Sequence, residues 1–255
     1  MNTLIRVTAI VTTCWMFTAA ITAQAETLRI ASEGAYPPFN YIDPDNTLHG
    51  FDIDIANALC ERMQVTCTFV TQDWEGMIPA LLAKKFDAIV ASMNVTEERK
   101  KKVAFTDRYY RTPLSLAVPK DSSSRDAQTD FKGLTVGTQS FSTQSIYAEE
   151  HYAAAGATVK LYPSQDEAVS DLAAGRLDAV IADKYPLLAW LNTTEKGKAC
   201  CTFLGDVEGT KADAAIVVRL EDNALRERFN TALAEIIADG TYKIIVSRYF
   251  DFDIY

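Results

Sequence analysis

Histidine and cysteine are scarce in this chain, whose 255 residues include two histidines and five cysteines. Neither His49 nor His151 has a ligand-like spacing to a cysteine, so we expect no metal site and no cofactor. Basic residues are outnumbered as well, with 25 lysines and arginines against 34 acidic residues, which gives a formal net charge of −9. This balance argues against nucleic acid as a partner. A small cationic ligand, by contrast, responds only to local charges.

Long apolar runs are also missing from most of the chain. Beyond the N-terminal segment, no stretch reaches the roughly 18 apolar residues that a membrane-spanning helix requires. Residues 1–25 have the form of a cleaved signal peptide: Arg6 is positive, residues 7–21 are mostly apolar, and Ala23-Gln24-Ala25 is a typical cleavage site. We therefore expect the mature chain to begin at Glu26 and to be exported.

Export permits disulfides, and four cysteines lie outside the expected signal peptide. Cys60 is predicted to end a helix and Cys67 to begin the next strand, a return short enough to bring the two within bridging distance. Cys200 and Cys201 are adjacent in the sequence, and a disulfide between neighbours is strained and rare. We expect these two residues to be buried or free thiols.

Strand-like and helix-like segments alternate through the chain. The first run comprises strands at 28–31, 66–71 and 86–91 and helices at 51–60 and 74–83. After a strand at 114–118 and a polar stretch at 119–126, the second run comprises strands at 134–137, 159–162 and 178–182 and helices at 142–150, 164–174 and 184–191. The last expected elements are a strand at 214–218 and helices at 222–238 and 241–249. The alternation predicts mostly parallel α/β sheets.

The two runs resemble each other. Residues 82–91 and 172–182 both read as a helix end, a basic turn and a strand that begins Asp-Ala. With the polar stretch between the runs, this favours two similar lobes over one large sheet. The second strand ends at Asp183 and the first opens into Ser92, so one strand end from each lobe is expected to face a cleft.

The segment 86–99 is a candidate for half of a binding site. Its strand opens into Ser92, Asn94 and Thr96, at the carboxyl end where open α/β sheets bind ligands. Either Asn94 or Thr96 can cap the following helix. Arg99, one turn into that helix, is a planar two-pronged donor suited to a carboxylate. Alternatively, Arg99 is a solvated helix residue beside three lysines.

Several motifs also occur in a characteristic order. They are Glu33-Gly34-Ala35-Tyr36-Pro37-Pro38-Phe39, Gly50-Phe51-Asp52-Ile53-Asp54-Ile55-Ala56, Asp73-Trp74-Glu75-Gly76-Met77-Ile78-Pro79-Ala80-Leu81, Phe86-Asp87-Ala88-Ile89, Thr96-Glu97-Glu98-Arg99, Phe105-Thr106-Asp107 and Asp239-Gly240-Thr241-Tyr242. In this order, behind a leader, the chain resembles the periplasmic binding proteins for polar and basic amino acids of ABC import systems. This group includes the histidine- and lysine/arginine/ornithine-binding proteins. The resemblance covers essentially the whole mature chain.

The resemblance implies a two-lobed α/β fold of the type II periplasmic-binding-protein class, with the ligand enclosed between the lobes. Each lobe would hold a mixed, mostly parallel sheet flanked by helices, and two crossover strands would form the hinge. Residues 26–115 and 216–255 would form lobe 1, and residues 116–215 would form lobe 2. Cys60 and Cys67 match a disulfide pair of the basic amino-acid branch.

The resemblance also implies how the ends of an amino acid would be held. Arg99 would bind the α-carboxylate, and the backbone N–H groups of Asn94 and Thr143 would add donors. Asp183 and Ser92 would bind the α-ammonium group.

The side chain of the ligand would lie between Tyr36 and Trp74, whose rings stack well on a cationic group. Glu33 would reach a distal positive charge. The remaining residues of the implied ligand-binding set are Ala91, Met93 and Gln139.

Four positions depart from the pattern of the family. Ala91 and Asn94 stand where close relatives often carry serines, and Gln139 and Phe141 stand where an aliphatic residue and a glycine are common. The anchors for the α-amino acid group are therefore kept, while the side-chain pocket differs.

The implied function is a periplasmic receptor that captures arginine, lysine, ornithine or histidine and delivers it to an inner-membrane ABC permease. It would be a monomer without covalent chemistry. Three alternatives remain: a receptor for an arginine-derived opine such as octopine, a receptor that signals to a membrane sensor, and an exported cyclohexadienyl or arogenate dehydratase on the same fold. The dehydratase needs a general acid–base pair in the cleft, and no histidine or lysine is expected in the cleft together with Glu33 and Asp183.

Overall fold

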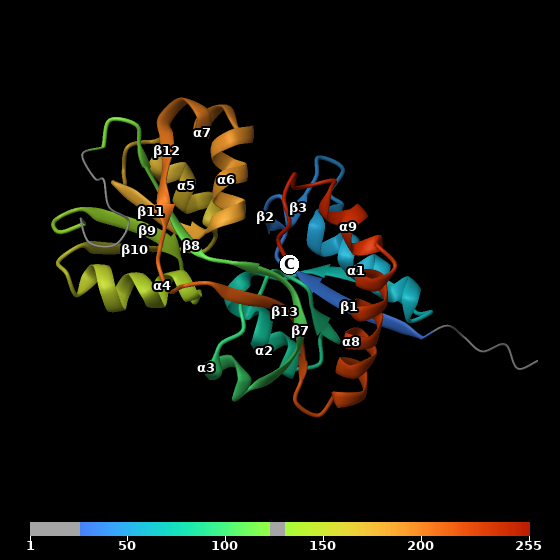
Figure 1. Ribbon diagram of the computed structural model, residues 1–255. Coiled ribbons are helices and arrows are strands. Elements are labelled where there is room, and N and C mark those ends of the chain that lie inside the picture. The colour runs from blue at the N-terminus through green and yellow to red at the C-terminus, as the bar shows by residue number, and fades with distance from the viewer. Residues whose placement is uncertain (1–25, 123–130) are drawn as a thin grey trace, which may run out of the picture.

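The computed structural model describes residues 26–122 and 131–255, which form two lobes (Figure 1). The predicted signal peptide at 1–25 and part of the predicted polar boundary at 119–126 lie outside the described residues. Each lobe contains one five-stranded sheet with helices packed against it.

Lobe 1 is built on a sheet with the strand order β5-β1-β6-β13-β7. Its strands are β1 (Thr27–Ser32), β5 (Thr66–Thr71), β6 (Ala88–Ile89), β7 (Val103–Thr112) and β13 (Ala212–Arg219). The first three are parallel, whereas β13 runs antiparallel to β6 and β7. Successive side chains point to opposite faces, so the fully buried Ile30 and Ala31 pack into different apolar clusters.

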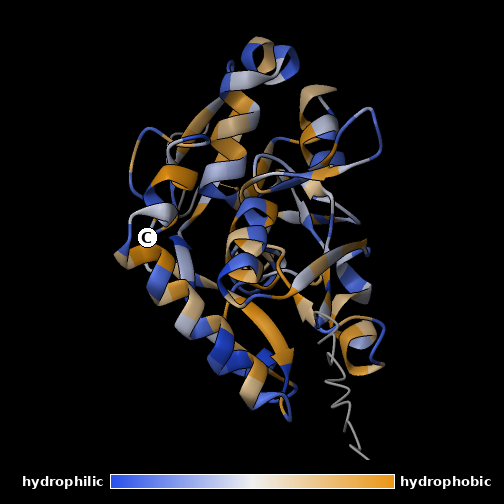
Figure 2. Ribbon diagram, turned by 90° about the vertical axis from the view of Figure 1, so that its right-hand side faces the viewer, coloured by the Kyte–Doolittle hydropathy of each residue, from blue (hydrophilic) through white to orange (hydrophobic). Residues whose placement is uncertain are grey.

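Helices cover both faces of this sheet, and Figure 2 shows apolar residues concentrated on the strands and on one side of the helices. The helices of lobe 1 are α1 (Phe51–Arg62), η1 (Trp74–Gly76), α2 (Met77–Leu82), α3 (Glu97–Lys100), α8 (Asn223–Ala238) and α9 (Thr241–Val246). In α8, Phe229, Leu233 and Ile236 recur at helical spacing and are buried in the same cluster as residues of α1. A small sheet of β2 (Ala35–Tyr36), β3 (Asn40–Ile42) and β4 (Leu48–His49) follows β1.

Lobe 2 repeats this plan with the strand order β10-β9-β11-β8-β12. Its strands are β8 (Leu114–Pro119), β9 (Thr135–Gln139), β10 (Thr158–Tyr162), β11 (Ala179–Asp183) and β12 (Cys201–Asp206). Its helices are α4 (Thr143–Tyr147), the π-helical η2 (Ala148–Ala153), α5 (Gln165–Ala173), α6 (Lys184–Thr193) and α7 (Glu195–Cys200). Strands β9, β10 and β11 are parallel, and β8 runs antiparallel to β11 and β12. The internal resemblance in the sequence thus corresponds to two sheets of the same topology.

The chain crosses between the two sheets twice. The first crossing is at Pro113, between β7 and β8, and the second is at residues 207–211, between β12 and β13. Figure 1 shows both connections running side by side from one lobe to the other. Because β13 lies in the first sheet, α8 and α9 at the end of the chain pack on lobe 1.

Some elements differ from the expectation. The helix expected at 142–150 is divided into α4 and η2, and the strand expected at 86–91 is reduced to the short β6. Strands β7 and β12, helix α7 and the small sheet were not expected. Strands β7 and β12 nevertheless complete the two five-stranded sheets, in each of which one of them is an edge strand.

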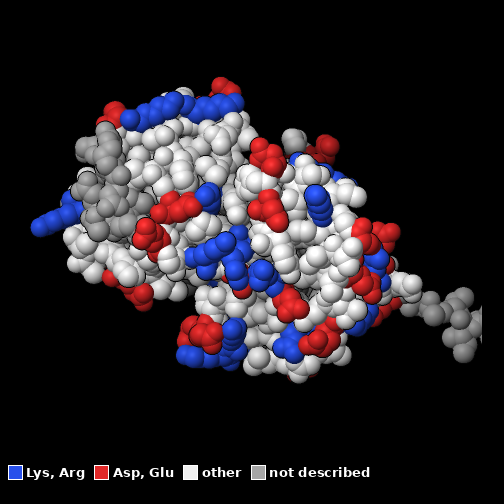
Figure 3. Space-filling model, in the orientation of Figure 1, with Lys and Arg blue, Asp and Glu red and all other residues white. Residues whose placement is uncertain are grey.

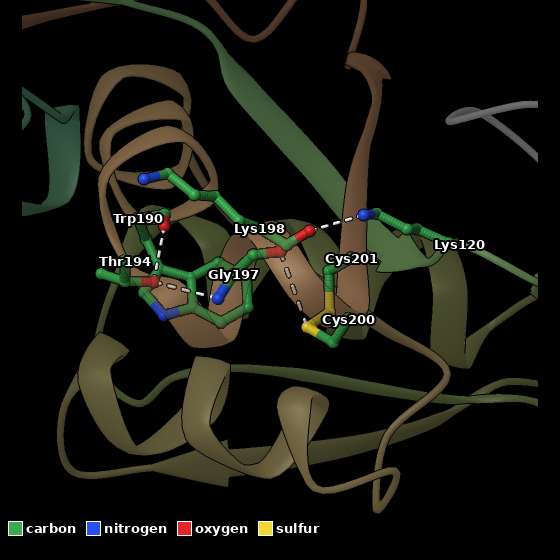
Figure 4. Close-up of a disulfide and its surroundings, with 7 residues drawn as sticks. All are labelled: Lys120, Trp190, Thr194, Gly197, Lys198, Cys200 and Cys201. Atoms are coloured by element: carbon green, nitrogen blue, oxygen red, sulfur yellow. Dashed lines mark hydrogen bonds between the residues drawn. A yellow bond between two sulfur atoms is a disulfide. The ribbon is translucent and has the colours of Figure 1, made fainter.

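Two disulfides are present among the described residues. The Cys60–Cys67 pairing is confirmed: it joins α1 to β5, with 6.1 Å between the Cα atoms. The expectation of two thiols at Cys200 and Cys201 is wrong, because these neighbours are joined to each other (Figure 4). The backbone changes from helical to extended at this peptide unit, where α7 ends and β12 begins. The Lys120 N–H group donates to the Cys200 carbonyl (3.0 Å), which fixes the junction to the end of β8.

Within residues 26–122 and 131–255, no helix has the length and apolar character needed to cross a bilayer. The same residues contain no cluster of three or more histidine, cysteine or acidic side chains with the geometry of a metal site. On the face shown in Figure 3, acidic and basic side chains are interspersed over both lobes, with basic side chains gathered at the centre of the view and along its upper edge.

Replacing both Cys60 and Cys67 with alanine should lower the free energy of unfolding by about 2–3 kcal/mol, because the bridge closes a short loop in the unfolded chain. Urea unfolding under non-reducing conditions measures this loss. Replacing Cys200 and Cys201 together is the matched control, and it should cost less because a bond between neighbours closes almost no loop. Equal midpoints for the wild type and the Cys60/Cys67 variant would show that this bridge contributes nothing.

Candidate binding site between the lobes

A small cavity of about 10 Å³ lies between the two lobes. This volume holds about one water molecule and is far below the range of about 300–1,000 Å³ that is usual for small-molecule sites, so the two lobes are tightly closed on each other. Its walls are formed by Glu33, Tyr36, Trp74, Ala91, Ser92, Asn94, Arg99, Gln139, Ser142, Thr143, Gln144 and Asp183. All residues expected at the site except Met93 are in this wall. Met93 is buried with an apolar cluster of lobe 1 instead.

Asp183 ends β11 and precedes α6, and its side chain does not cap that helix. Its carboxylate reaches across the cleft, where it accepts hydrogen bonds from the Tyr36 hydroxyl (2.7 Å) and the Asn94 amide (3.3 Å). Burial raises the pKa of Asp183 to about 6, although these two donors and the nearby Arg99 oppose the shift. The protein thus holds a carboxylate where ionisation is costly unless a positive charge is close.

Arg99 is half-buried at the cleft rather than solvated. Thr96, not Asn94, caps α3, since its hydroxyl accepts from the Arg99 backbone N–H (3.1 Å). The guanidinium donates to the Asn94 carbonyl (2.7 Å) and lies 5.3 Å from the centre of the Trp74 ring. Burial lowers the pKa of Arg99 to about 10, which still leaves it charged at neutral pH. It can therefore present its remaining N–H groups to an anion.

The backbone of Phe141 joins the lobes at the rim of the cavity. Its carbonyl accepts from Trp74 Nε1 and from the Arg99 guanidinium, each at 3.2 Å. Phe141 has a left-handed conformation (φ 55°), and its ring is exposed. This double contact depends on the docking of two segments that are far apart in the sequence, so no local pattern could have revealed it.

Glu33 and Gln139 form a second polar contact across the cleft. The Gln139 amide donates to Glu33 Oε1 (2.6 Å) and to the Pro163 carbonyl (3.3 Å). Burial raises the pKa of Glu33 to about 7; the Gln139 hydrogen bond opposes this shift, and Asp166 adds to it. Gln139 thus orients the carboxylate, and no group in the described part of the chain donates to the other Glu33 oxygen.

The start of α4 completes the wall. Ser142 caps this helix in a reciprocal arrangement with Ser145, and the Thr143 hydroxyl accepts from the Asn94 amide (3.0 Å). Thr143 in turn donates to Gln144 (3.0 Å). Sequence reasoning placed Ser142 at the start of the helix expected at 142–150 but did not assign Ser142 or Gln144 to the site.

Ser92 is placed at the cavity in a left-handed conformation (φ 55°). Its hydroxyl donates inward to Asp52, at 3.0 Å and 3.2 Å from the two carboxylate oxygens. Its oxygen can still accept a hydrogen bond from a ligand. The neighbouring Ala91 adds only a methyl group to the wall.

The ionisable groups of the cavity wall indicate the net charge of the ligand. Two carboxylates, Glu33 and Asp183, lie in the same wall as one guanidinium, that of Arg99. When all three are charged, the wall has a net charge of −1. A buried charge is stabilised by an opposite charge, so the cavity favours a ligand with one more positive group than negative groups.

The sequence matches the model of one protein family, the bacterial extracellular solute-binding proteins of family 3, over residues 28–252. The chain belongs to this family. This match confirms the resemblance to solute-binding proteins that the order of the motifs indicated.

Relatives of this family 3 protein carry names of binding proteins. It is 44% identical over 232 residues to the L-arginine-binding protein of Pseudomonas aeruginosa, with 89% of each chain covered. It is 39% identical over 241 residues to the histidine-binding periplasmic protein of Escherichia coli, with 93% of each chain covered. A solved structure of an ancestral arginine-binding protein bound to arginine matches with a TM-score of 0.83 at 36% identity, covering 88% of this chain and 98% of that chain. The expected two-lobed α/β fold is confirmed.

Proposed function

We propose that this chain is a periplasmic receptor that binds one cationic amino acid between its lobes. The observation that carries the proposal is the charge inventory of the cavity, two carboxylates and one guanidinium. A cationic amino acid has the complementary set, two positive groups and one carboxylate. Two relatives are named as an L-arginine-binding protein and a histidine-binding protein, and these names support the same class of ligand.

Each end of the ligand has a matching partner. The α-carboxylate pairs with Arg99, whose planar donors suit a bidentate contact. The α-ammonium group pairs with Asp183, with the Ser92 oxygen as a further acceptor. The backbone N–H groups of Asn94 and Thr143 add donors at the carboxylate end.

The side chain of the ligand extends toward Glu33, which accepts its distal positive charge beside Gln139. On the way it lies against the rings of Tyr36 and Trp74, which attract a cation through their π-systems. Neutral amino acids would leave Glu33 without a counter-ion in a buried site. This difference is the basis of selectivity for a cationic ligand.

Binding closes the lobes by hinge motion at the two crossings, because the ligand contacts both lobes. We place the hinge at Pro113 and at residues 207–211, where the chain passes from one sheet to the other. The boundaries between the lobes, expected after residues 115 and 215, then lie at Pro113 and at residues 207–211.

Residues 1–25 act as a signal peptide that is removed during export. The receptor works as a monomer and presents its closed form to an inner-membrane ABC permease. An opine receptor would need a partner for a second carboxylate, and the one guanidinium in the cavity wall favours the simpler amino acid. A dehydratase would need a general acid–base pair, and the cavity wall formed by the described residues contains neither histidine nor lysine.

Arginine, lysine, ornithine or histidine at millimolar concentration should raise the melting temperature, because ligand binds the folded state alone. At 100 times the Kd the gain is about 2.7 kcal/mol, or roughly 5–10 °C for a chain of this size. Differential scanning fluorimetry measures the shift. Glutamate, whose net charge is negative, is the control and should give none. If none of the four cations shifts the transition, the proposed ligand class is wrong.

Binding of arginine should weaken as the pH falls below 7, by up to about tenfold per pH unit. The pKa of Glu33 is raised to about 7, so below this pH the carboxyl is protonated and a bound cation has to displace the proton. Glu33→Gln should bind more weakly at pH 8 and should lose the part of the pH dependence near 7. Calorimetric titrations at several pH values measure both effects. Glu75→Gln, an exposed neighbour of Trp74, is the control. Identical pH profiles for Glu33→Gln and the wild type would exclude Glu33 as the distal anchor.

A further inference from the structure

Asp52 lies outside the binding cavity but is fully buried in lobe 1. It is the second residue of α1, and acids in a first turn usually face solvent near the helix N-terminus. Here the side chain makes no cap for its own helix. Its carboxylate points into the lobe instead, where it accepts hydrogen bonds from Asn40, Ser92 and Tyr109.

One side of this carboxylate holds the loop that contains Ser92. Tyr109, on β7, donates its hydroxyl to Asp52 Oδ1 (2.7 Å) and accepts from the Ser92 backbone N–H (2.8 Å). The Ser92 hydroxyl donates directly to Asp52 Oδ2 (3.0 Å). Both polar groups of Ser92 that can donate are thus fixed to this network, which holds the residue in its left-handed conformation.

The other side holds the loop that contains Glu33 and Tyr36. Asn40 donates its amide to Asp52 Oδ2 (2.7 Å), and its own Oδ1 accepts from the Gly34 backbone N–H (2.8 Å). Asn40 also pairs with Tyr36 between β3 and β2. The network therefore connects Asp52 to both loops, the one that carries Ser92 and the one that carries Glu33 and Tyr36.

The charge of Asp52 is costly for the fold. No ion pair to Asp52 is present in the described part of the chain, and burial raises its pKa to about 6, against the effect of the Tyr109, Asn40 and Ser92 hydrogen bonds. The folded-state pKa is thus above that of the unfolded chain, so stability falls as the pH rises from about 4 through 6. Stability alone does not explain why an acid occupies this position. Buried polar networks of this kind fix one geometry when every member is satisfied.

We propose that Asp52 is a positioning residue that sets the separation between the two lobe 1 loops that bind opposite ends of the ligand. One loop carries Ser92 at the α-ammonium end. The other carries Glu33 at the side-chain end and Tyr36, whose hydroxyl donates to Asp183. This inference rests on the proposed function, since it assigns the two loops to the two ends of a cationic amino acid.

The hydrogen bonds around Asp52 suggest a single and a double variant that together test the proposal. In Asp52→Asn, the new amide group has to face either the amide of Asn40 or the two hydroxyl donors, so at least one donor loses its acceptor. If Asn40→Asp is added, the introduced carboxylate accepts from the amide at position 52 and from Gly34. The carbonyl oxygen at position 52 then still accepts from Ser92 and Tyr109. The double variant restores every contact with the charge moved by one residue.

Calorimetric titration with arginine at pH 8 tests the proposal. Asp52→Asn should bind at least about tenfold more weakly than the wild type, and the double variant should recover to within about threefold. Far-UV circular dichroism and a melting curve establish that each variant is folded at the temperature of the titration. Should Asp52→Asn fail to fold, Tyr109→Phe takes its place. It removes a single link of the network and should weaken binding at least threefold.

Asp54→Asn is the matched control on the same helix, because Asp54 pairs with Arg248 and Tyr249 away from the cavity. It should lose stability and keep its affinity for arginine. Unchanged affinity in Asp52→Asn overturns the proposal, and so does an equal loss in the single and double variants. If the wild type binds no cationic amino acid, the proposed function fails, and that result is visible before any variant is compared.

Discussion

The cleft is organised by one buried carboxylate, that of Asp183, whose donors all lie in the opposite lobe. Tyr36 and Asn94 reach it from two different loops of lobe 1. Burial disfavours its charge, so the position is stable only where donors or cations surround it. This requirement fixes where the two loops of lobe 1 have to lie when the lobes meet, and the other contacts across the cleft are compatible with that arrangement.

Four of the polar groups at the cleft stand at or just after the carboxyl ends of parallel strands. Glu33 follows β1, Ser92 lies shortly after β6, Gln139 ends β9 and Asp183 ends β11. Open α/β sheets bind ligands at this edge, and here two such edges face each other. The repeated sheet topology of the lobes therefore gives the site two walls, and the sequence differences between the strand ends give those walls their charge.

The sequence was informative where function and local structure coincide. The strand ends at Ser92 and Asp183 could be predicted because a buried apolar run stops there and small or acidic residues follow. The order of motifs, rather than any single one, identified the family and with it the return of the C-terminus to lobe 1. The local sequence left Arg99 open between a carboxylate anchor and a solvated residue beside three lysines, and the second strand end at Asp183 together with the resemblance favoured the anchor.

Other features depend on contacts that no local pattern encodes. Strand β7 was missed because charged and aromatic residues interrupt its alternation. Asp52 stands in the first turn of α1, where acids usually face solvent, whereas tertiary packing turns it inward. The Phe141 carbonyl meets Trp74 and Arg99 only when the lobes dock, and the bond between Cys200 and Cys201 depends on the junction of α7 and β12.

The most direct measurement of the central claim compares arginine with citrulline, which replaces the guanidinium by a neutral urea group of nearly the same shape. The charge balance of Glu33, Asp183 and Arg99 predicts that arginine binds at least about 100-fold more tightly in calorimetric titrations at pH 8, where Glu33 is ionised, because citrulline leaves a buried carboxylate unpaired. Equal affinities for the two ligands would contradict the account.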